Sequence, residues 1–193
     1  TADITIGDVV LSSPDGLVLI TNRYTPNAAL SGGGILITGE GPLGDGINAE
    51  GGAEQGGAVF LDARGDIEVI NSFISTQGSG DVGDVVLLAG DLVRLDGSDG
   101  TIAGAFSDVA PGGAGRGGDV RIMASNLEVT NGAFVFADTS GIGDAGNVLL
   151  SISETARFDG ASVVSSDVVG EGNGGNVVIS ARNLEVANGA QLA

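Results

Sequence analysis

The chain has 193 residues, of which 36 are glycine, and its 25 acidic residues outnumber seven basic ones, all arginine, to give a net charge of −18 at pH 7. Such a chain is a poor partner for nucleic acid or an anionic membrane surface, because both require clustered positive charge. It has no histidine and no cysteine, which excludes Ser/His and Cys/His nucleophilic sites. We interpret the excess acid chiefly as a solubility device, with divalent cation binding as the alternative.

Residues 1–55 are the less regular part of the chain. Strand-like runs occur at 4–6, 9–11, 17–21 and 34–38, separated by turn-forming residues. Glycine interrupts every apolar pattern of helical spacing, so the chain is predicted to be all-β. We expect residues 1–55 to form irregular or degenerate N-terminal coils of one continuous array.

Residues 56–193 contain a glycine-led strand that recurs. The copies start near Gly57, Gly83, Gly118, Gly146 and Gly175, at spacings of 26, 35, 28 and 29 residues, which is typical of a solenoid. After each glycine, apolar residues alternate with freer positions, so one face should point into a core. The predicted inward pairs are Val59/Leu61, Val85/Leu87, Val120/Ile122, Val148/Leu150 and Val177/Ile179.

A second strand follows as an apolar–charged–apolar triplet. Its outward residues are Glu68, Arg94, Glu128, Arg157 and Glu185, and we expect these alternating charges to pair between coils. The triplet starts one residue later in the first, second and fourth copies, which predicts a one-residue insertion in the turn before it. Aligned corner residues such as Asp119, Asn147 and Asn176 are predicted to form side-chain ladders.

A third strand is predicted after turns such as Asn131-Gly132 and Asp159-Gly160. Val135, Val163 and Leu192 occupy its matching inward positions, and a variable glycine-rich or acidic loop closes each coil. Three short strands per repeat predict a parallel β-helix in which stacked coils pair in parallel ladders. We expect the chain to be one segment of a longer array.

Phe134 and Phe136 flank Val135, so alternation turns them outward as a candidate contact surface. The alternative is that a loop or a neighbouring row of strands covers them.

Three further motifs have weaker functional interpretations. Arg64-Gly65-Asp66 is a tripeptide that integrins recognise, although each residue is ordinary at a corner. The run 78–84 is similar to a calcium-binding nonapeptide but lacks the tandem period, so calcium in the loops stays an alternative. The carboxylate pairs Asp62/Asp66 and Asp81/Asp84 are the nearest approach to a glycan-cleaving site, but they favour solvated corners, and we expect no enzyme.

The repeat at 174–192, GGNVVISARNLEVANGAQL, resembles the repeats of filamentous-haemagglutinin-like exoproteins, particularly those of cyanobacteria, and the resemblance covers about residues 56–193. It implies a right-handed parallel β-helix, export to the outer surface of a bacterium by two-partner secretion, and a role in adhesion or surface structure. Its implied partners are surface or matrix components or other copies, with no cofactor or catalytic residue. A glycan-binding or glycan-cleaving β-helix and a calcium-dependent surface-layer component are the alternative functions.

Overall fold

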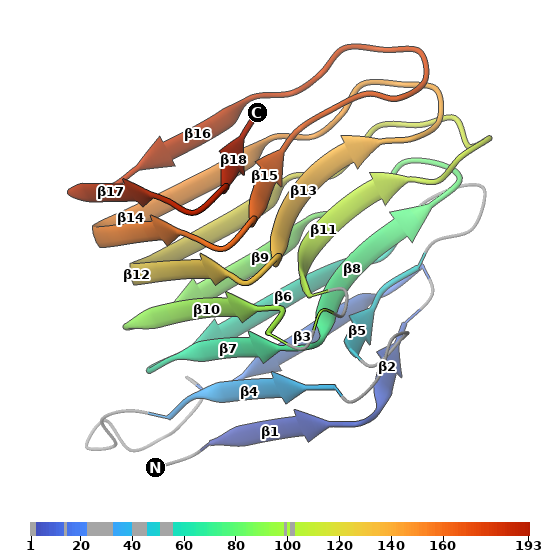
Figure 1. Ribbon diagram of the computed structural model, residues 1–193. Helices are drawn as coiled ribbons and strands as arrows, with labels where there is room; N and C mark the ends of the chain where they lie inside the picture. The colour runs from blue at the N-terminus through green and yellow to red at the C-terminus, as the bar shows by residue number, and fades with distance from the viewer. Residues whose placement is uncertain are drawn as a thin grey trace.

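The computed structural model describes residues 3–13, 15–22, 33–39, 46–50, 56–98, 100 and 103–193. In these residues the chain is all-β, and parallel strands stack in successive coils as a β-solenoid (Figure 1), as the repeats predict. The strands are β1 (Ile4–Gly7), β2 (Val10–Ser12), β3 (Leu17–Thr21), β4 (Ile35–Thr38), β5 (Gly46–Asn48), β6 (Ala58–Ala63), β7 (Ile67–Ile70), β8 (Phe73–Gly78), β9 (Val85–Ala89), β10 (Leu92–Asp96), β11 (Gly104–Val109), β12 (Val120–Thr130), β13 (Phe134–Thr139), β14 (Val148–Phe158), β15 (Val163–Ser165), β16 (Val177–Ser180), β17 (Asn183–Val186) and β18 (Gln191–Leu192).

The strands form three rows along the solenoid. Row 1 follows the repeat glycines and contains β3, β6, β9, the first parts of β12 and β14, and β16. Row 2 contains β1, β4, β7, β10, the second parts of β12 and β14, and β17. Row 3 contains β2, β5, β8, β11, β13, β15 and β18. The described strands before residue 55 therefore lie in the same rows as the regular repeats.

The core lies between the rows and consists of alternate residues of each strand. The predicted inward residues of row 1 from Val59 to Leu150 are at most 2% exposed, and burying one such side chain stabilises the fold by about 1.5–3 kcal/mol. Val177 and Ile179 are only partly buried, because the described chain places no further coil over them. One coil cannot bury these faces alone, so stability comes from stacking.

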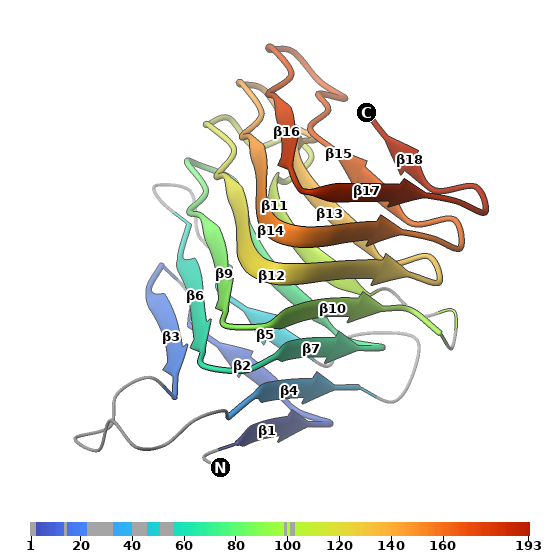
Figure 2. The ribbon, with the colours of Figure 1, turned by 90° about the vertical axis from the view of Figure 1, so that its left-hand side faces the viewer.

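Rows 1 and 2 meet at a bend, which β12 and β14 pass through without a break (Figure 2). The pairing of these two strands shifts there: Ala124 pairs with Ile152, whereas Asn126 pairs with Thr155. β14 thus holds one more residue at the bend, which confirms the predicted insertion and keeps Phe158 inside the core.

Row 3 corrects one prediction in the coil that begins at Gly146. Val135 pairs with Val164, and Val164 pairs with Leu192. Val164 is therefore the inward residue, with no exposed surface, whereas Val163 pairs with Phe134 on the outer face.

The error arose in the turn before row 3. Because Val129 pairs with Phe158, Asn131 lies opposite Gly160 and not opposite Asp159. The two positive-φ positions of this corner are Asn131 (55°) and Gly132 (78°) in one coil, but Gly160 (63°) and Ala161 (60°) in the next. Ala161 thus adopts a left-handed conformation that alanine disfavours.

Buried serines join row 3 to the glycine corners of row 1. The hydroxyl of Ser107 donates to the Gly83 carbonyl (3.3 Å) and accepts the Gly118 N–H (3.0 Å). The hydroxyl of Ser166 repeats this arrangement, since it donates to the carbonyl of Gly146 (2.6 Å) and accepts the N–H of Gly175 (2.9 Å). Each serine therefore bridges two successive coils from inside the core.

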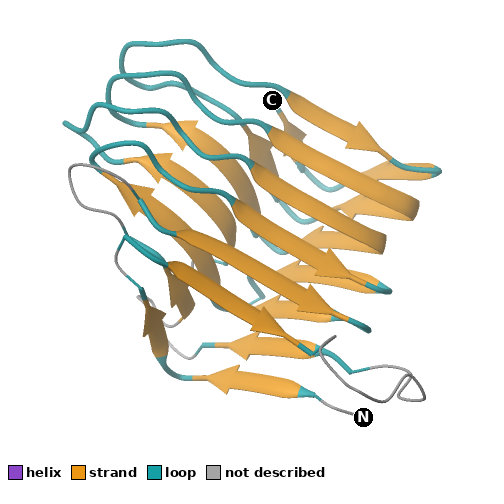
Figure 3. Ribbon diagram, turned by 180° about the vertical axis from the view of Figure 1, so that it is seen from behind, coloured by secondary structure: helices purple, strands orange, loops and turns teal. Residues whose placement is uncertain are grey.

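The loops that lead from row 3 to row 1 lie over one another at one edge of the solenoid (Figure 3). Ile142 bridges Ala114 on one side and Glu171 on the other. Stacking brings the backbones so close that a Cβ on Gly143 would lie 1.8 Å from the Gly115 oxygen. Glycine in these loops is therefore required by coil packing.

Candidate functional site

The acidic corner residues act mainly as hydrogen-bond acceptors for the next coil. In each case the carboxylate or amide oxygen of one coil accepts a backbone N–H of the following coil at 2.7–3.1 Å. The pairs are Asp3 with Gly34, Asn22 with Arg64, Asp66 with Leu92, Asp81 with Arg116, Asp84 with Asp119, Asp108 with Ser140, Asp119 with Asn147, Asp138 with Asp167, Asp144 with Asn173 and Asn147 with Asn176. Because charge-assisted bonds of this kind are strong, much of the acid excess has a structural role in addition to solubility.

Five corners pair an aspartate with an asparagine one coil later, and two of them also belong to the set of backbone N–H acceptors above. The asparagine Nδ2 donates to the aspartate Oδ1 at 2.6–3.4 Å in Asp91/Asn126, Asp96/Asn131, Asp119/Asn147, Asp144/Asn173 and Asp159/Asn188. The predicted ladder at Asp119, Asn147 and Asn176 is thus confirmed, and Asp84 extends it. The N–H and amide of Asn173 lower the pKa of Asp144.

The charged row on the outside of row 2 pairs only in part as predicted. Arg94 lies between Glu68 (3.6 Å) and Glu128 (2.8 Å), and the bond to Glu128 raises the pKa of Arg94. Arg157, in contrast, forms its ion pair with Asp159 on its own strand side, which lowers the pKa of Asp159. Arg157 thus pairs with a residue two positions along its own chain segment and not with Glu128 or Glu185, which lie opposite it on the adjacent coils.

The Arg64-Gly65-Asp66 corner lies between β6 and β7, and all three residues are partly buried. The Asp66 carboxylate accepts the Leu92 N–H (3.0 Å), and the Gly65 N–H donates to the Gly33 carbonyl (2.9 Å). Both interactions join this corner to neighbouring coils, so the tripeptide has a packing role here.

Of the four carboxylates considered for catalysis or calcium, Asp66, Asp81 and Asp84 have the same structural use, whereas Asp62 lies on β6. Asp81 accepts the Arg116 N–H, and Asp84 accepts the Asp119 N–H and forms an ion pair with Arg121. Arg121 also pairs with Asp119. Within the described ranges there is no group of three or more acidic side chains placed to hold a metal ion.

Phe134 and Phe136 lie on the outer face of row 3, half-buried, within a row of four phenylalanines. Their rings stack at 4.5 Å and 11°, and Phe106 lies 5.5 Å from Phe134 and 5.8 Å from Phe73. Each ring therefore packs against a neighbouring ring, and Phe134 and Phe136 keep part of their surface exposed.

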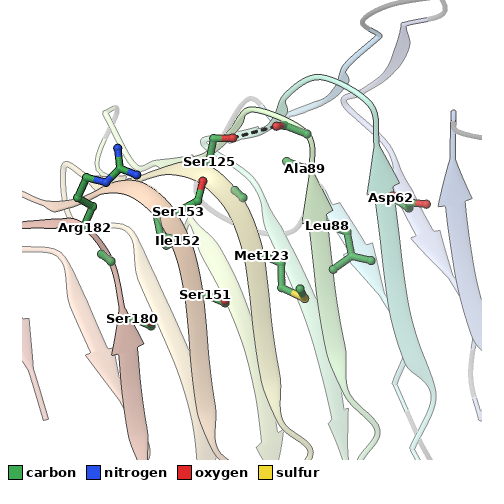
Figure 4. Close-up of a pocket in the computed structure, with 13 residues that line it drawn as sticks. Asp62, Leu88, Ala89, Met123, Ser125, Ser151, Ile152, Ser153, Ser180 and Arg182 are labelled. Atoms are coloured by element: carbon green, nitrogen blue, oxygen red, sulfur yellow. Dashed lines mark hydrogen bonds between the residues drawn. The ribbon is translucent and has the colours of Figure 1, made fainter.

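A groove at the bend between rows 1 and 2 is a feature that the sequence patterns did not indicate. We call it the bend groove; it has a volume of about 890 Å³ and its lining residues are drawn in Figure 4. One wall of the groove consists of residues that pair with one another across successive row 1 strands. The other wall consists of residues at the bend itself. The lining residues are Asp62, Leu88, Ala89, Gly90, Met123, Ala124, Ser125, Ser151, Ile152, Ser153, Ser180, Ala181 and Arg182.

The bend groove combines apolar and hydroxyl groups. Met123 is 53% exposed and lies beside Leu88, its partner on β9. Ser151 and Ser180 continue the same line on β14 and β16. At the corner wall, the Ser125 hydroxyl donates to the Gly90 carbonyl (3.1 Å). The sequence does contain a signal for this groove, which appears when the residue that follows each inward pair is aligned between repeats. These residues are Asp62, Leu88, Met123, Ser151 and Ser180.

The described part of the chain contains no helix that is long and apolar enough to cross a membrane. Comparison with known proteins gives no match to a family model, to a curated protein or to a solved structure.

Proposed function

We propose that the chain is an extracellular structural and adhesive β-solenoid segment at the surface of a bacterium, which extends as a rod and presents its outer faces to matrix, other surface components or further copies. The observation that carries the proposal is that hydrogen bonds join every described coil to the next. Backbone ladders join each pair of described coils in all three rows, and corner side chains add a bond from each coil to the next. Such a one-dimensional stack resists bending and repeats its outer surface at every coil.

The outer face of row 1 supports an adhesive role. Its central positions are apolar in all but one coil: Leu19 and Val178 are 56% and 50% exposed, and Phe60, Val86 and Leu149 are partly buried. The exception is Arg121, whose charge is balanced by Asp84 and Asp119. An extended apolar face on an otherwise acidic molecule is typical of a contact surface. The resemblance of residues 174–192 to filamentous exoprotein repeats supports the same role.

The proposal is tested in the producing bacterium with an antibody to this segment. We expect the segment to be accessible on intact cells and to be removed by external protease. Finding it only inside intact cells, protected from protease, would contradict an extracellular role.

Adhesion is tested separately with beads coated with the purified protein. We expect Leu149→Lys, which places a charge on the apolar face, to reduce attachment to bacterial surfaces. Gln191→Lys adds the same charge at an exposed position of row 3 and should leave attachment unchanged. Equal attachment by both variants would argue against the row 1 face as the adhesive surface.

A further inference from the structure

We infer that the bend groove binds a single extended, unbranched and neutral polysaccharide chain, which lies along the solenoid axis. The inference deepens the proposed adhesive function and rests on it, because it names what one presented surface holds. Four properties of the groove support it: direction, spacing, surface chemistry and charge.

The groove runs across the strands and therefore along the solenoid. Met123 pairs with Leu88 on one side and with Ser151 on the other, and Ser151 pairs with Ser180. Neighbouring strands lie about 4.8 Å apart, so the five wall residues from Asp62 to Ser180 span roughly 19 Å. A linear ligand of several units would fit this length.

The spacing favours a sugar chain over a peptide. One wall position recurs per coil at about 4.8 Å, whereas an extended peptide advances about 3.3 Å per residue and soon loses register with such a wall. An extended chain of β-linked pyranose rings advances by about one ring per coil. Each ring can thus meet an equivalent wall position in successive coils.

The surface of the groove matches the two kinds of group that a pyranose ring presents. Leu88 and Met123 offer apolar surface to C–H groups, and Ile152, which is 4% exposed, lies at the base. Ser151, Ser153 and Ser180 are exposed, and their hydroxyls bond to no other residue in the described ranges. These hydroxyls are available to donate to and accept from sugar hydroxyls.

The charge of the groove favours a neutral ligand. Among the described residues that line the groove, only Asp62 and Arg182 are charged, and Arg182 also pairs with Glu154 at 2.7 Å. A polyanionic glycan would be repelled by a chain of net charge −18. Because Asp62 is the single carboxylate among the lining residues that the structure describes, these residues do not assemble the two carboxyl groups used in glycoside hydrolysis. The groove is suited to binding, not to cleavage.

The test is titration calorimetry of the purified chain with cellohexaose, a neutral β-linked chain, and with maltohexaose, an α-linked chain that curves. We expect cellohexaose to bind at least about tenfold more tightly. Ser151→Lys fills the groove from an exposed position and should weaken cellohexaose binding at least about tenfold. Gln191→Lys adds the same charge outside the groove and should leave the affinity unchanged. Thermal unfolding of each variant verifies that it is folded.

Absence of cellohexaose binding at millimolar concentration, equal affinity for both sugars, or equal affinity of the two lysine variants would overturn the inference. The inference would also be overturned if the groove instead joins two copies of the chain. Sedimentation would then show self-association of the unmodified protein, and Ser151→Lys would abolish it. These outcomes are separable from failure of the proposed function. Cellohexaose binding by a protein that is found only inside cells would contradict the surface role alone. Adhesive beads without cellohexaose binding would contradict the groove assignment alone.

Discussion

Replacing Ser107 with alanine is expected to destabilise the solenoid through lost hydrogen bonds. The Ser107 hydroxyl is fully buried and accepts the Gly118 N–H at 3.0 Å. Its removal leaves that N–H buried without this acceptor, which costs about 1–3 kcal/mol. The Gly83 carbonyl keeps the hydroxyl of Thr76 at 2.8 Å, so the loss should stay near 2 kcal/mol.

The packing contribution to this change is small. Ala137 pairs with Ser107 in the next coil and is itself fully buried, so the site accommodates alanine. For a chain of this length, a loss of about 2 kcal/mol lowers the thermal midpoint by about 4–8 °C. Because each coil contacts only its neighbours, the effect should be centred on the interface between the coils that begin at Gly83 and Gly118.

Urea and thermal unfolding followed by circular dichroism measure the change in stability. The matched control is Ser180→Ala, at an exposed hydroxyl, which should change stability by less than about 0.5 kcal/mol. If Ser107→Ala is as stable as this control, the bridging serines do not hold the coils together and the reasoning is refuted.

Four further changes test other parts of the structure. Ala161→Gly should stabilise the fold by about 0.5–1 kcal/mol in urea unfolding, because Ala161 has a φ of 60°; a loss of stability would contradict the assigned corner. Burial raises the pKa of Asp138, so its stabilising contribution is present at low pH and is lost as the pH rises. Asp138→Asn, which retains an acceptor oxygen, should therefore raise the thermal midpoint at pH 7, with a gain that disappears below about pH 4; a gain independent of pH would refute this cause. Gly90→Ala should cost more than about 2 kcal/mol, since its Cβ would lie 1.8 Å from the Arg64 oxygen, while Gly174→Ala, whose nearest neighbour is at 3.1 Å, should cost much less in the same assay. EDTA should leave the thermal midpoint unchanged, because the corner carboxylates already accept backbone N–H groups; a clear decrease would favour the calcium-dependent alternative.

The parallel β-solenoid could be predicted from the sequence because its core positions alternate strictly. Val59/Leu61 and the corresponding pairs of later coils are inward, and the charged triplets of row 2 fall in register as the sequence indicates. Period-two alternation survives small insertions, because an extra corner residue leaves the next inward face intact.

The error at Val163 shows the limit of aligning turns by residue type. Asn131-Gly132 and Asp159-Gly160 look equivalent, yet the pairing of Val129 with Phe158 displaces the second turn by one residue. Strand pairing outweighs turn preference here, and Ala161 accepts the positive φ. Local propensity could not reveal this without the register of the preceding row.

The bend groove and the bridging serines were missed for a different reason. Their residues come from different coils, or from opposite ends of one coil, and are ordinary serine, alanine and methionine. Only the stacking of rows brings them together. The acid excess was likewise interpreted as solubility, because hydrogen bonds between coils leave no local pattern beyond an aspartate followed one period later by asparagine.

Hydrogen exchange at the corner amides tests most directly whether acidic side chains bind each coil to the next. Amide exchange resolved by NMR should show slow exchange for the Leu92, Asn147 and Asn173 N–H groups, each of which has a side-chain acceptor on the preceding coil. In Asp119→Ala the Asn147 N–H should exchange at least about tenfold faster, while the Leu92 N–H, whose acceptor is Asp66, should keep its rate. Fast exchange of these corner amides in the unmodified protein, or an Asn147 rate unaffected by Asp119→Ala, would contradict the account.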